Sequence, residues 1–403
     1  MTSQAAENTN PLSDETRKLI DGWLEPDGPV ALHLRQKLLP VEADENGVIF
    51  PPTYADIGYN IDTLSDGTRV VTIDSVGSQA NRLEPIFKSE SQNPQDWLVP
   101  QIEIDLGDGK SISLLDLAHR AADAVVQSTP DLLSLIKPAF KELQQGNAGS
   151  LCTIAPTSLV FGVWDSRGDT GEKRPRLVRS IIRAWDVELL HAAAQFNSIW
   201  KLLVEQQQKQ LTDEAKKKKV KLSEKGLADA PGVFRPKIKA PQYVNGAPNP
   251  EARVLGGVRV KDSGRIEREV IVNLVALRGL RGENKTETEA IRKYLLGLSL
   301  VAATADIALF LREGCLLRYA DNGDMWHQIP RRGEPAQVNL SGDKIKQYAE
   351  TVAADFRKKW PDKFKDKWPK ENGKMPELKY EFKIEEAKKL LAKKTPEPEG
   401  ASE

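Results

Sequence analysis

Cysteine and histidine are scarce in this chain. Among its 403 residues are 2 cysteines and 4 histidines, and Cys152 and Cys315 lie far apart, without a CxxC pair or a neighbouring histidine. This pattern argues against a disulfide framework and against a structural zinc site. The HExxH motif and the GxxxxGK[ST] phosphate loop are also missing. The sequence therefore predicts no metal and no cofactor, and it disfavours nucleotide-driven chemistry.

Long apolar runs are missing as well. The longest, residues 294–311, is interrupted by Asp306 and contains Gly297 and Ser299, which predicts a buried helix rather than a membrane span. The opening segment, MTSQAAENTNPLSDE, has neither the basic nor the apolar region of a signal peptide. Together with the unpaired cysteines, these features predict a protein of the reducing cytoplasm that has no membrane partner.

The chain has no overall excess of charge of either sign. Lysine plus arginine number 58, and aspartate plus glutamate also number 58, so any signal for a polyanion partner must be local. Residues 167–183, RGDTGEKRPRLVRSIIR, carry six basic and two acidic side chains. The Lys-rich run at 214–221 is a weaker signal, because most such runs are solvated surfaces. The segment 167–183 is thus the local candidate for a nucleic-acid contact.

The order of predicted elements indicates an α+β fold. A strand at 69–74 precedes a helix to about residue 88, and a strand at 100–106 precedes helices at 113–127 and 131–144. The later part repeats this order. The sequence predicts a strand at 267–277, a helix at 286–311, a strand at 315–319 and a hairpin turn at Asn322-Gly323. The two halves together predict a split ferredoxin-like, RRM-like palm with a large insertion.

The insertion covers about residues 157–250. Its pattern predicts a long hairpin, or thumb, from strands at 157–164 and 176–185, then a helix from Val187 to about Glu224 and an exposed loop at 228–250. We therefore expect an N-terminal lead-in at 1–48 and a palm at 49–330. A basic C-terminal extension, expected to be peripheral with a disordered end, then covers 331–403.

The segment DSVGSQANRLE, residues 74–84, follows a strand and predicts a helix capped by Ser75. At helical spacing Ser75, Ser78 or Gln79, and Arg82 share one polar face. A helix N-terminus with an arginine nearby suits a phosphate group. The alternative is a capped surface helix, which the spacing alone slightly favours.

Two further segments carry candidate residues. In LAHRAADAV, His119 and Asp123 lie one helical turn apart, as do Asp116 and Arg120. This spacing fits acid–base chemistry, but it is also common in helix surface pairs, and contact with RNA or with another subunit stays open beside a structural role. The segment KRPRLVRSIIR suits phosphate binding by a mobile hairpin or, alternatively, a charged edge strand; its candidates are Lys173, Arg174, Arg176, Arg179 and Arg183.

The segment PTSLVFGVWDS predicts a strand that ends in Asp165-Ser166. Phe161 and Trp164 on an exposed sheet would suit base stacking, whereas a buried strand is at least as consistent with the pattern. Aromatic residues make up 6% of the chain, and no RNP-type cluster of aromatics is present. Base stacking is therefore not the main prediction.

Taken in order, DSVGSQANRLE, LAHRAADAV, PTSLVFGVWDS and KRPRLVRSIIRA resemble the backbone subunit of type I-G (formerly I-U) CRISPR surveillance complexes, a RAMP member of the Cas-seven superfamily. The resemblance spans about residues 50–320. It implies that several copies stack along one guide RNA and hold its sugar-phosphate backbone, while the guide itself reads the target sequence. It also implies RNA-binding roles for Ser75, Ser78, Gln79, Asn81 and Arg82.

The resemblance implies a set of partners: the CRISPR guide RNA, target DNA through the guide, other copies of the chain, and the large and repeat-processing subunits of a Cascade complex. It implies no catalysis. Type III relatives cut target RNA with an acidic residue, so a metal-dependent ribonuclease that uses Asp74, Asp165 or Asp169 is the competing enzyme hypothesis. A stand-alone RNA-binding scaffold is a third possibility.

Overall fold

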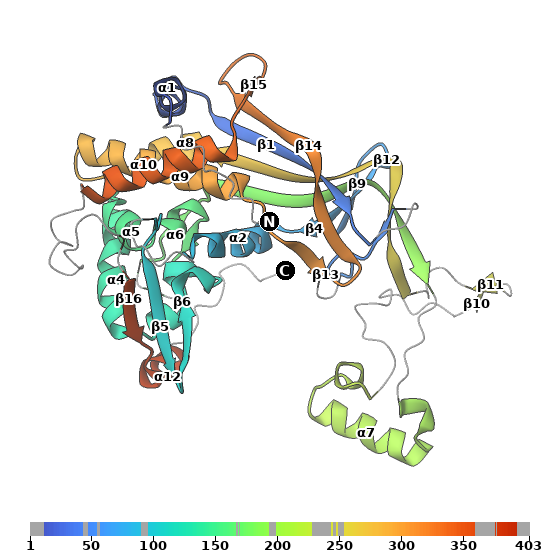
Figure 1. Ribbon diagram of the computed structural model, residues 1–403. Coiled ribbons are helices and arrows are strands. Elements are labelled where there is room, and N and C mark those ends of the chain that lie inside the picture. Colours follow the sequence, from blue (N-terminus) through green and yellow to red (C-terminus); the bar gives the residue numbers. More distant parts are fainter. Residues whose placement is uncertain are drawn as a thin grey trace, which may run out of the picture.

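The main sheet of the computed structural model has the strand order of a ferredoxin-like fold. Neighbouring strands run in the order β13-β14-β1-β12-β9-β4-β3, and β1, β12, β9 and β14 pair with their neighbours in antiparallel fashion (Figure 1). The structure describes residues 12–42, 47–54, 57–89, 96–166, 168, 170–192, 199–227, 243–244, 247–248, 254–358, 375 and 377–392. The α+β class predicted from the sequence is confirmed.

The strands of this sheet are β1 (Ala31–Pro40), β2 (Val48–Ile49), β3 (Ile61–Thr63), β4 (Arg69–Asp74), β9 (Val178–Ala192), β12 (Val254–Asn273), β13 (Leu309–Arg312), β14 (Cys315–Ile329) and β15 (Ala336–Val338). Four of them form the palm. In chain order these are β1, β9, β12 and β14, and in space the fourth lies beside the first, followed by the third and the second. Helices join β1 to β9 and β12 to β14, as the fold requires.

The first palm strand lies where the sequence analysis expected a lead-in. Within the expected lead-in, residues 31–40 are not peripheral, because β1 pairs with β12 on one side and β14 on the other. Leu32, Leu34 and Leu38 are buried while Arg35 and Lys37 are exposed, which is the alternation of a strand with one covered face. The strand predicted at 69–74 is present as β4. It pairs with β9 on the side away from β12, so it lies beyond the palm and is not the first palm strand.

One face of the sheet is covered by helices, among them α2 (Val76–Leu83), α9 (Lys285–Thr304) and α10 (Gly342–Lys358), which Figure 1 shows on the same side of the sheet. Arg268 of β12 is fully buried on this side. Its guanidinium donates to Gln36 Oε1 at 2.6 Å and to Ser180 Oγ at 3.1 Å, and also to the carbonyl of Ala302. This one side chain ties β1, β9 and β12 to the end of α9, so its hydrogen bonds offset the cost of burying the charge.

Helix α10, which falls within the expected C-terminal extension, packs into the core rather than lying at the periphery. Tyr294 of α9 stacks on Phe356 of α10 with ring centroids 4.5 Å apart. Gly297 allows this close approach, because a Cβ atom there would lie 2.9 Å from Val352 Cγ2. The disordered end predicted for this segment lies outside the described residues beyond 392.

A smaller layer packs below the palm in Figure 1. Its sheet has the order β16-β5-β6, and β16 pairs in parallel with β5. The elements of this region are β5 (Gln101–Gly107), β6 (Lys110–Ser113), α3 (Ala124–Gln127), α4 (Pro130–Gln144), α5 (Gly149–Ile154), α6 (Pro156–Val160), β16 (Glu377–Glu381) and α12 (Ile384–Ala392). The strand at 100–106 and the helix at 131–144 were thus predicted correctly.

Several local predictions in the middle of the chain were wrong. Residues 157–164 form α6 and the short β7 (Val163–Trp164) rather than one strand, and since residues 156–161 are all buried, no alternation could distinguish the two states. The helix predicted from Val187 begins later, because β9 stays paired with β12 to Ala192. Asn322-Gly323 makes no hairpin turn: β14 runs through it with a register shift against β1.

The remaining elements are α1 (Asp14–Gly22), α7 (Glu205–Lys217), α8 (Leu274–Gly279), β8 (Lys173–Arg174), β10 (Tyr243–Val244), β11 (Ala247–Pro248) and the 3-10 turns Glu84–Phe87, Leu114–Asp116, Arg120–Ala122, Ile199–Leu202 and Leu222–Lys225. Most of the loop predicted at 228–250 lies outside the described residues. Within the part of the chain that the structure describes, no helix is long and apolar enough to cross a membrane.

Candidate nucleic-acid interface

The face of the palm opposite the helices is polar and largely basic. Ser180 and Arg268 point toward the helices, so their neighbours along each strand point the other way. The polar and aromatic side chains on this open face are His33, Arg35 and Lys37 of β1, Arg179, Arg183 and Trp185 of β9, Arg265, Glu267 and Glu269 of β12, and His327 of β14; Ile181, Ile271 and Met325 lie among them. Arg35, Lys37, Arg179 and Arg265 are exposed. An open sheet face of this architecture is a common platform for single-stranded RNA.

Trp185 lies between two guanidinium groups on this open face. The guanidinium carbon of Arg183 is 4.8 Å from the ring centroid, and that of Arg265 is 5.1 Å away. Arg265 is the direct cross-strand partner of Trp185. Cation–π contacts of this kind orient both the ring and the cations. The cluster therefore offers an aromatic side chain for stacking, but its two cations are already paired, Arg183 with Glu269 at 2.8 Å and Arg265 with Glu267 at 2.9 Å.

A carboxylate neutralises part of the open face. Glu269 contacts His33 Nε2 at 3.0 Å and Arg183 Nη2 at 2.8 Å. The hydrogen bond from His33 and the nearby charge of Arg183 outweigh burial and hold the pKa of Glu269 at about 2. Arg183 is thus already paired. By contrast, Arg35, Lys37 and Arg179 form no ion pair with any residue that the structure describes, which leaves them available to phosphates.

Helix α2 has the predicted cap but not the predicted RNA-facing stripe. Ser75 Oγ accepts the Ser78 N–H at 3.3 Å, as expected for an N-cap. Gln79, however, is fully buried. Its amide donates to Asp74 Oδ2 at 2.6 Å, and its carbonyl oxygen accepts from Ser180 Oγ at 2.7 Å. The structure therefore corrects the assignment of Gln79, whose side chain fastens α2 to β9 and cannot reach a ligand.

The other α2 candidates remain accessible. Asn81 is exposed and Arg82 is partly exposed. Arg82 Nε lies 3.2 Å from the buried carboxylate of Asp74, so its guanidinium is paired inside the protein on one side. Asp74 is thus engaged by Gln79 and Arg82, and it positions α2.

His119 and Arg120 have different surroundings. The helix predicted at 113–127 is broken here, because Arg120 adopts a left-handed conformation with φ of 55° and Asp123 caps the separate helix α3. His119 is exposed, but Arg120 is buried and its Nε lies 2.6 Å from Glu84 Oε2. The expected RNA contact of Arg120 is corrected, since its guanidinium is taken up inside the protein.

The five remaining basic candidates lie on β8, on β9 and in the short segment between them. On β8, Lys173 lies over the Trp164 ring at 5.3 Å, and Arg174 pairs with Glu172 at 2.7 Å. Arg176 is exposed beside this short hairpin. Arg179 and Arg183 lie on β9, on the open face. Ser180 of β9 is hydrogen-bonded to Gln79 of α2 on the helical face of the sheet. Arg179 and Arg183 point to the other face, so they and the α2 candidates lie on different sides of the sheet.

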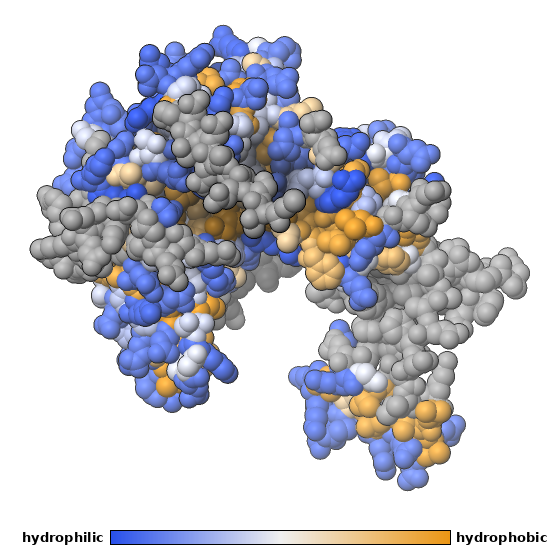
Figure 2. Space-filling model, viewed as in Figure 1, coloured by the Kyte–Doolittle hydropathy of each residue, from blue (hydrophilic) through white to orange (hydrophobic). Residues whose placement is uncertain are grey.

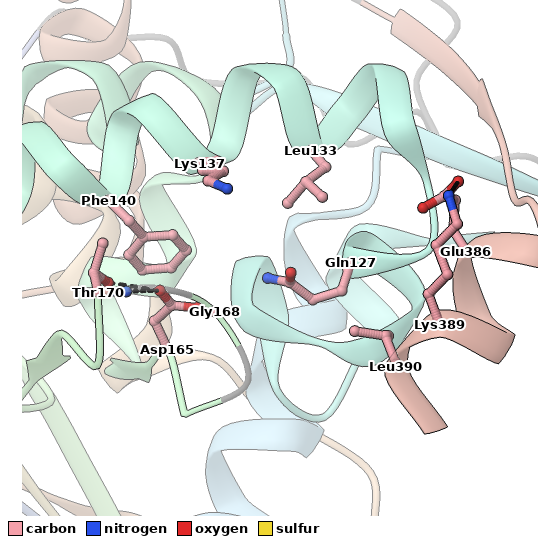
Figure 3. Close-up of a pocket in the computed structure, with 10 residues that line it drawn as sticks. All are labelled: Gln127, Leu133, Lys137, Phe140, Asp165, Gly168, Thr170, Glu386, Lys389 and Leu390. Atoms are coloured by element: carbon pink, nitrogen blue, oxygen red, sulfur yellow. Dashed lines mark hydrogen bonds and ion pairs between the residues drawn. The ribbon is translucent and has the colours of Figure 1, made fainter. Parts of the chain in front are cut away.

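Asp165 lies in a cavity of about 220 Å³, away from the open face. Figure 3 shows it beside Thr170 and Phe140, with Gln127, Leu133 and Leu390 on the other side of the cavity. Thr170 Oγ1 donates to Asp165 Oδ2 at 2.6 Å, and Asp165 is almost fully buried. Asp169 lies outside the described residues. In the described ranges no group of three or more His, Cys, Asp or Glu side chains could hold a metal ion.

Sequence reasoning missed the residues that make the open face basic on β1. His33, Arg35 and Lys37 fell within the expected lead-in, although ALHLRQKL alternates with the period of a strand. That alternation was the available signal. Trp185 and Arg265 carried no comparable signal, because they come together only through the pairing of β9 with β12.

Residues 32–189 match the family model described as CRISPR-associated protein GSU0053 (Cas_GSU0053). This part of the chain is similar to a CRISPR-associated protein family. The match begins in β1 and ends in β9, so it includes α2, His119, Arg179, Arg183 and Trp185. It stops before β12, α9 and β14, which complete the palm. No curated protein matches the chain.

Proposed function

We propose that this protein is a non-catalytic guide-RNA-binding backbone subunit of a type I CRISPR surveillance complex, of the type I-G kind. The observation that carries the proposal is the open face of the palm, where Trp185 contacts two guanidiniums and shares the face with the unpaired cations Arg35, Lys37 and Arg179. Cationic side chains bind the phosphates of the backbone, and an aromatic ring stacks on a base of any type, so neither reads the base sequence. The match to a CRISPR-associated family supports a guide RNA as the strand.

In this proposal the bound guide pairs with target DNA, and several copies of the chain line up along it with the large and repeat-processing subunits. An exposed apolar group at the β13 end of the sheet suits contact with a neighbouring protein surface. Figure 2 shows hydrophobic side chains gathered there, and Val41, Phe50 and Phe310 are 51%, 40% and 57% exposed. The main-chain bonds of Val41 to Leu316 and of Phe50 to Gly314 hold these side chains around the β13–β14 hairpin.

The proposal is tested by RNA retention. The protein is co-expressed with a CRISPR guide RNA, and binding is measured over a series of salt concentrations. Reversing two open-face charges, Arg35→Glu with Arg179→Glu, is expected to weaken binding by at least about tenfold and to reduce the salt slope by about 2, since each lost phosphate contact removes about one unit. The matched control reverses two exposed lysines outside the main sheet, Lys110→Glu with Lys344→Glu. Equal retention by both double variants would remove the open face as the RNA site.

Two further measurements separate the alternatives. Native mass measurement should give several copies per guide, and a one-to-one complex would count against stacking. For the ribonuclease alternative, the assembled complex is incubated with Mg²⁺ and a labelled complementary RNA. Guide-dependent cuts at regular intervals that disappear in Asp74→Ala, Asp165→Ala or Asp169→Ala would overturn the non-catalytic proposal.

A further inference from the structure

A second basic surface lies on the helical side of the palm. A cleft of about 760 Å³ opens between α1, α8 and the start of α9. Five cationic side chains line it, from α8, α9 and the segment after β14, together with three carboxylates; they are Arg278, Lys285, Arg292, Lys293 and Arg331, and Asp21, Glu25 and Glu289. The cleft therefore carries more positive than negative charge and is separate from the open sheet face.

The carboxylates do not neutralise the arginines. Asp21 is engaged by Lys293 at 2.7 Å and by the hydroxyl of Tyr348 at 2.8 Å. Glu25 and Glu289 are exposed, and neither forms an ion pair with the residues that the structure describes. Arg278, Arg292 and Arg331 are accordingly left without a carboxylate partner among the described residues.

Main-chain carbonyls hold the three guanidiniums in place. Arg278 Nη1 donates to the Trp23 carbonyl at 2.8 Å, Arg292 Nε to that of Leu280 at 2.9 Å, and Arg331 Nη2 to that of Pro26 at 2.5 Å. Each group uses one nitrogen in this way. The Nη2 atom of Arg278 is buried and has no hydrogen-bond partner in the described part of the chain. An unpaired buried donor on a charged group is costly. Because Nη2 itself is inaccessible, an anion in the cleft would offset this cost through the charge of the guanidinium rather than by direct contact with Nη2.

The charges also act on one another. Burial, followed by the positive charges of Arg331 and Arg292, lowers the pKa of Arg278. Burial and the charge of Arg281 lower the pKa of Arg292, and Glu289 opposes this only in part. Like charges held close without a counter-ion are unfavourable, and an anion placed between them removes that cost.

We propose that this cleft binds a phosphate group through Arg278, Arg292 and Arg331. Guanidinium forks from separate elements suit the several oxygens of a phosphate better than the two of a carboxylate. The cleft is also larger than one phosphate group, so it accommodates a phosphate-bearing molecule. The phosphate belongs either to a small compound or to a nucleic-acid strand that passes the helical side of the subunit. The site does not depend on the guide-RNA proposal, because none of its residues lies on the open face.

Calorimetry on the full chain with pyrophosphate at low salt tests this site. The double variant Arg292→Gln with Arg331→Gln is expected to bind pyrophosphate at least about tenfold more weakly, the loss expected from removing charge-assisted hydrogen bonds. The control Arg332→Gln with Lys344→Gln makes the same change in net charge at exposed positions outside the cleft, and it should bind as the wild type does. Thermal melting confirms that both variants fold.

Two further arms identify the source of the phosphate and keep this proposal apart from the first. If oligothymidylate binds more tightly than pyrophosphate and loses affinity in the cleft variant, the phosphate belongs to a nucleic-acid strand. If only pyrophosphate binding is weakened in the cleft variant, the phosphate belongs to a small compound. The open-face variant Arg35→Glu with Arg179→Glu should retain pyrophosphate binding even if guide binding fails. No saturable binding, or equal binding by the cleft variant and its control, would overturn the proposal.

Discussion

Arg120 and Glu84 form a buried ion pair that joins the His119 loop to the end of α2. The Nε atom of Arg120 lies 2.6 Å from Glu84 Oε2, and the two side chains are 6% and 2% exposed. The guanidinium also lies 5.5 Å from the Phe161 ring centroid and donates to the carbonyl of Gly162. The pair thus positions two of the segments that the sequence had marked as candidates for RNA contact.

Removing one partner of this pair should destabilise the fold. Arg120→Met leaves Glu84 buried without its counter-charge, and we expect a loss of about 3 kcal/mol in the free energy of unfolding at pH 8, measured by urea denaturation. The control is Arg17→Met, which removes an exposed pair with Asp355 whose side chains are 41% and 45% exposed; it should cost less than about 1 kcal/mol. Equal losses in the two variants would contradict a special role for the buried pair.

The same pair makes stability depend on pH. Burial, opposed by the charge of Arg120, raises the pKa of Glu84 from 4.5 to about 7. A raised pKa in the folded state means that the stability from this group is present below pH 4.5 and is lost as pH rises toward 7. In Arg120→Met the pKa rises further, so the decline should continue above pH 7, whereas Glu84→Gln with Arg120→Met should abolish it. Urea melts at pH 6 and pH 8 distinguish the three proteins.

The aromatic platform on the open face predicts a specific loss of RNA binding. Trp185→Ala removes the ring between Arg183 and Arg265, and we expect guide binding to weaken by about 1 to 3 kcal/mol. Trp164→Ala is the matched control, since Trp164 is 57% exposed and lies on β7, outside the main sheet. Fluorescence anisotropy with labelled guide RNA measures both variants. A larger effect at Trp164 would move the interface to the β7–β8 hairpin.

Glu269 should account for part of the stability at acid pH. Because its pKa is lowered to about 2 in the folded state, its contribution is present above its ordinary value of 4.5 and is lost as pH falls toward 2. Glu269→Gln should therefore reduce the loss of unfolding free energy between pH 5 and pH 2 by at most about 3 kcal/mol. Thermal melts of wild type and variant between pH 2 and 5 measure the difference. Parallel curves would show that the contacts of Glu269 with His33 and Arg183 add no net stability.

The contact between α9 and α10 predicts an intolerant glycine. In Gly297→Ala the new Cβ would lie 2.9 Å from Val352 Cγ2 and 3.0 Å from Ala349 Cα, and we expect a loss of about 1 to 3 kcal/mol from overpacking. Gly22→Ala is the control, because a Cβ there meets nothing within 4 Å. It should be neutral or slightly stabilising. Thermal denaturation that ranks the two variants the other way would show that α10 does not pack firmly on α9.

Local patterns in the sequence were enough for elements whose own periodicity is clear. The helix at 131–144, the strand at 176–185, the cap at Ser75 and the buried helix that begins near residue 286 were all predicted, because each depends on residues a few positions apart. Where a segment is buried on all sides, as at residues 156–161, the periodicity disappears and the prediction failed.

The α+β class, the order of many elements and the resemblance that points to a guide-RNA-binding role can all be read from the amino-acid sequence. The identity of the first palm strand and the outward orientation of particular polar side chains depend instead on tertiary contacts. Gln36 and Arg268 are 232 residues apart yet hydrogen-bonded, and Gln79 is buried because Ser180 of β9 faces it. Such pairings depend on how distant strands align, and that alignment, rather than local pattern, separates a buried anchor from a residue that can bind a ligand.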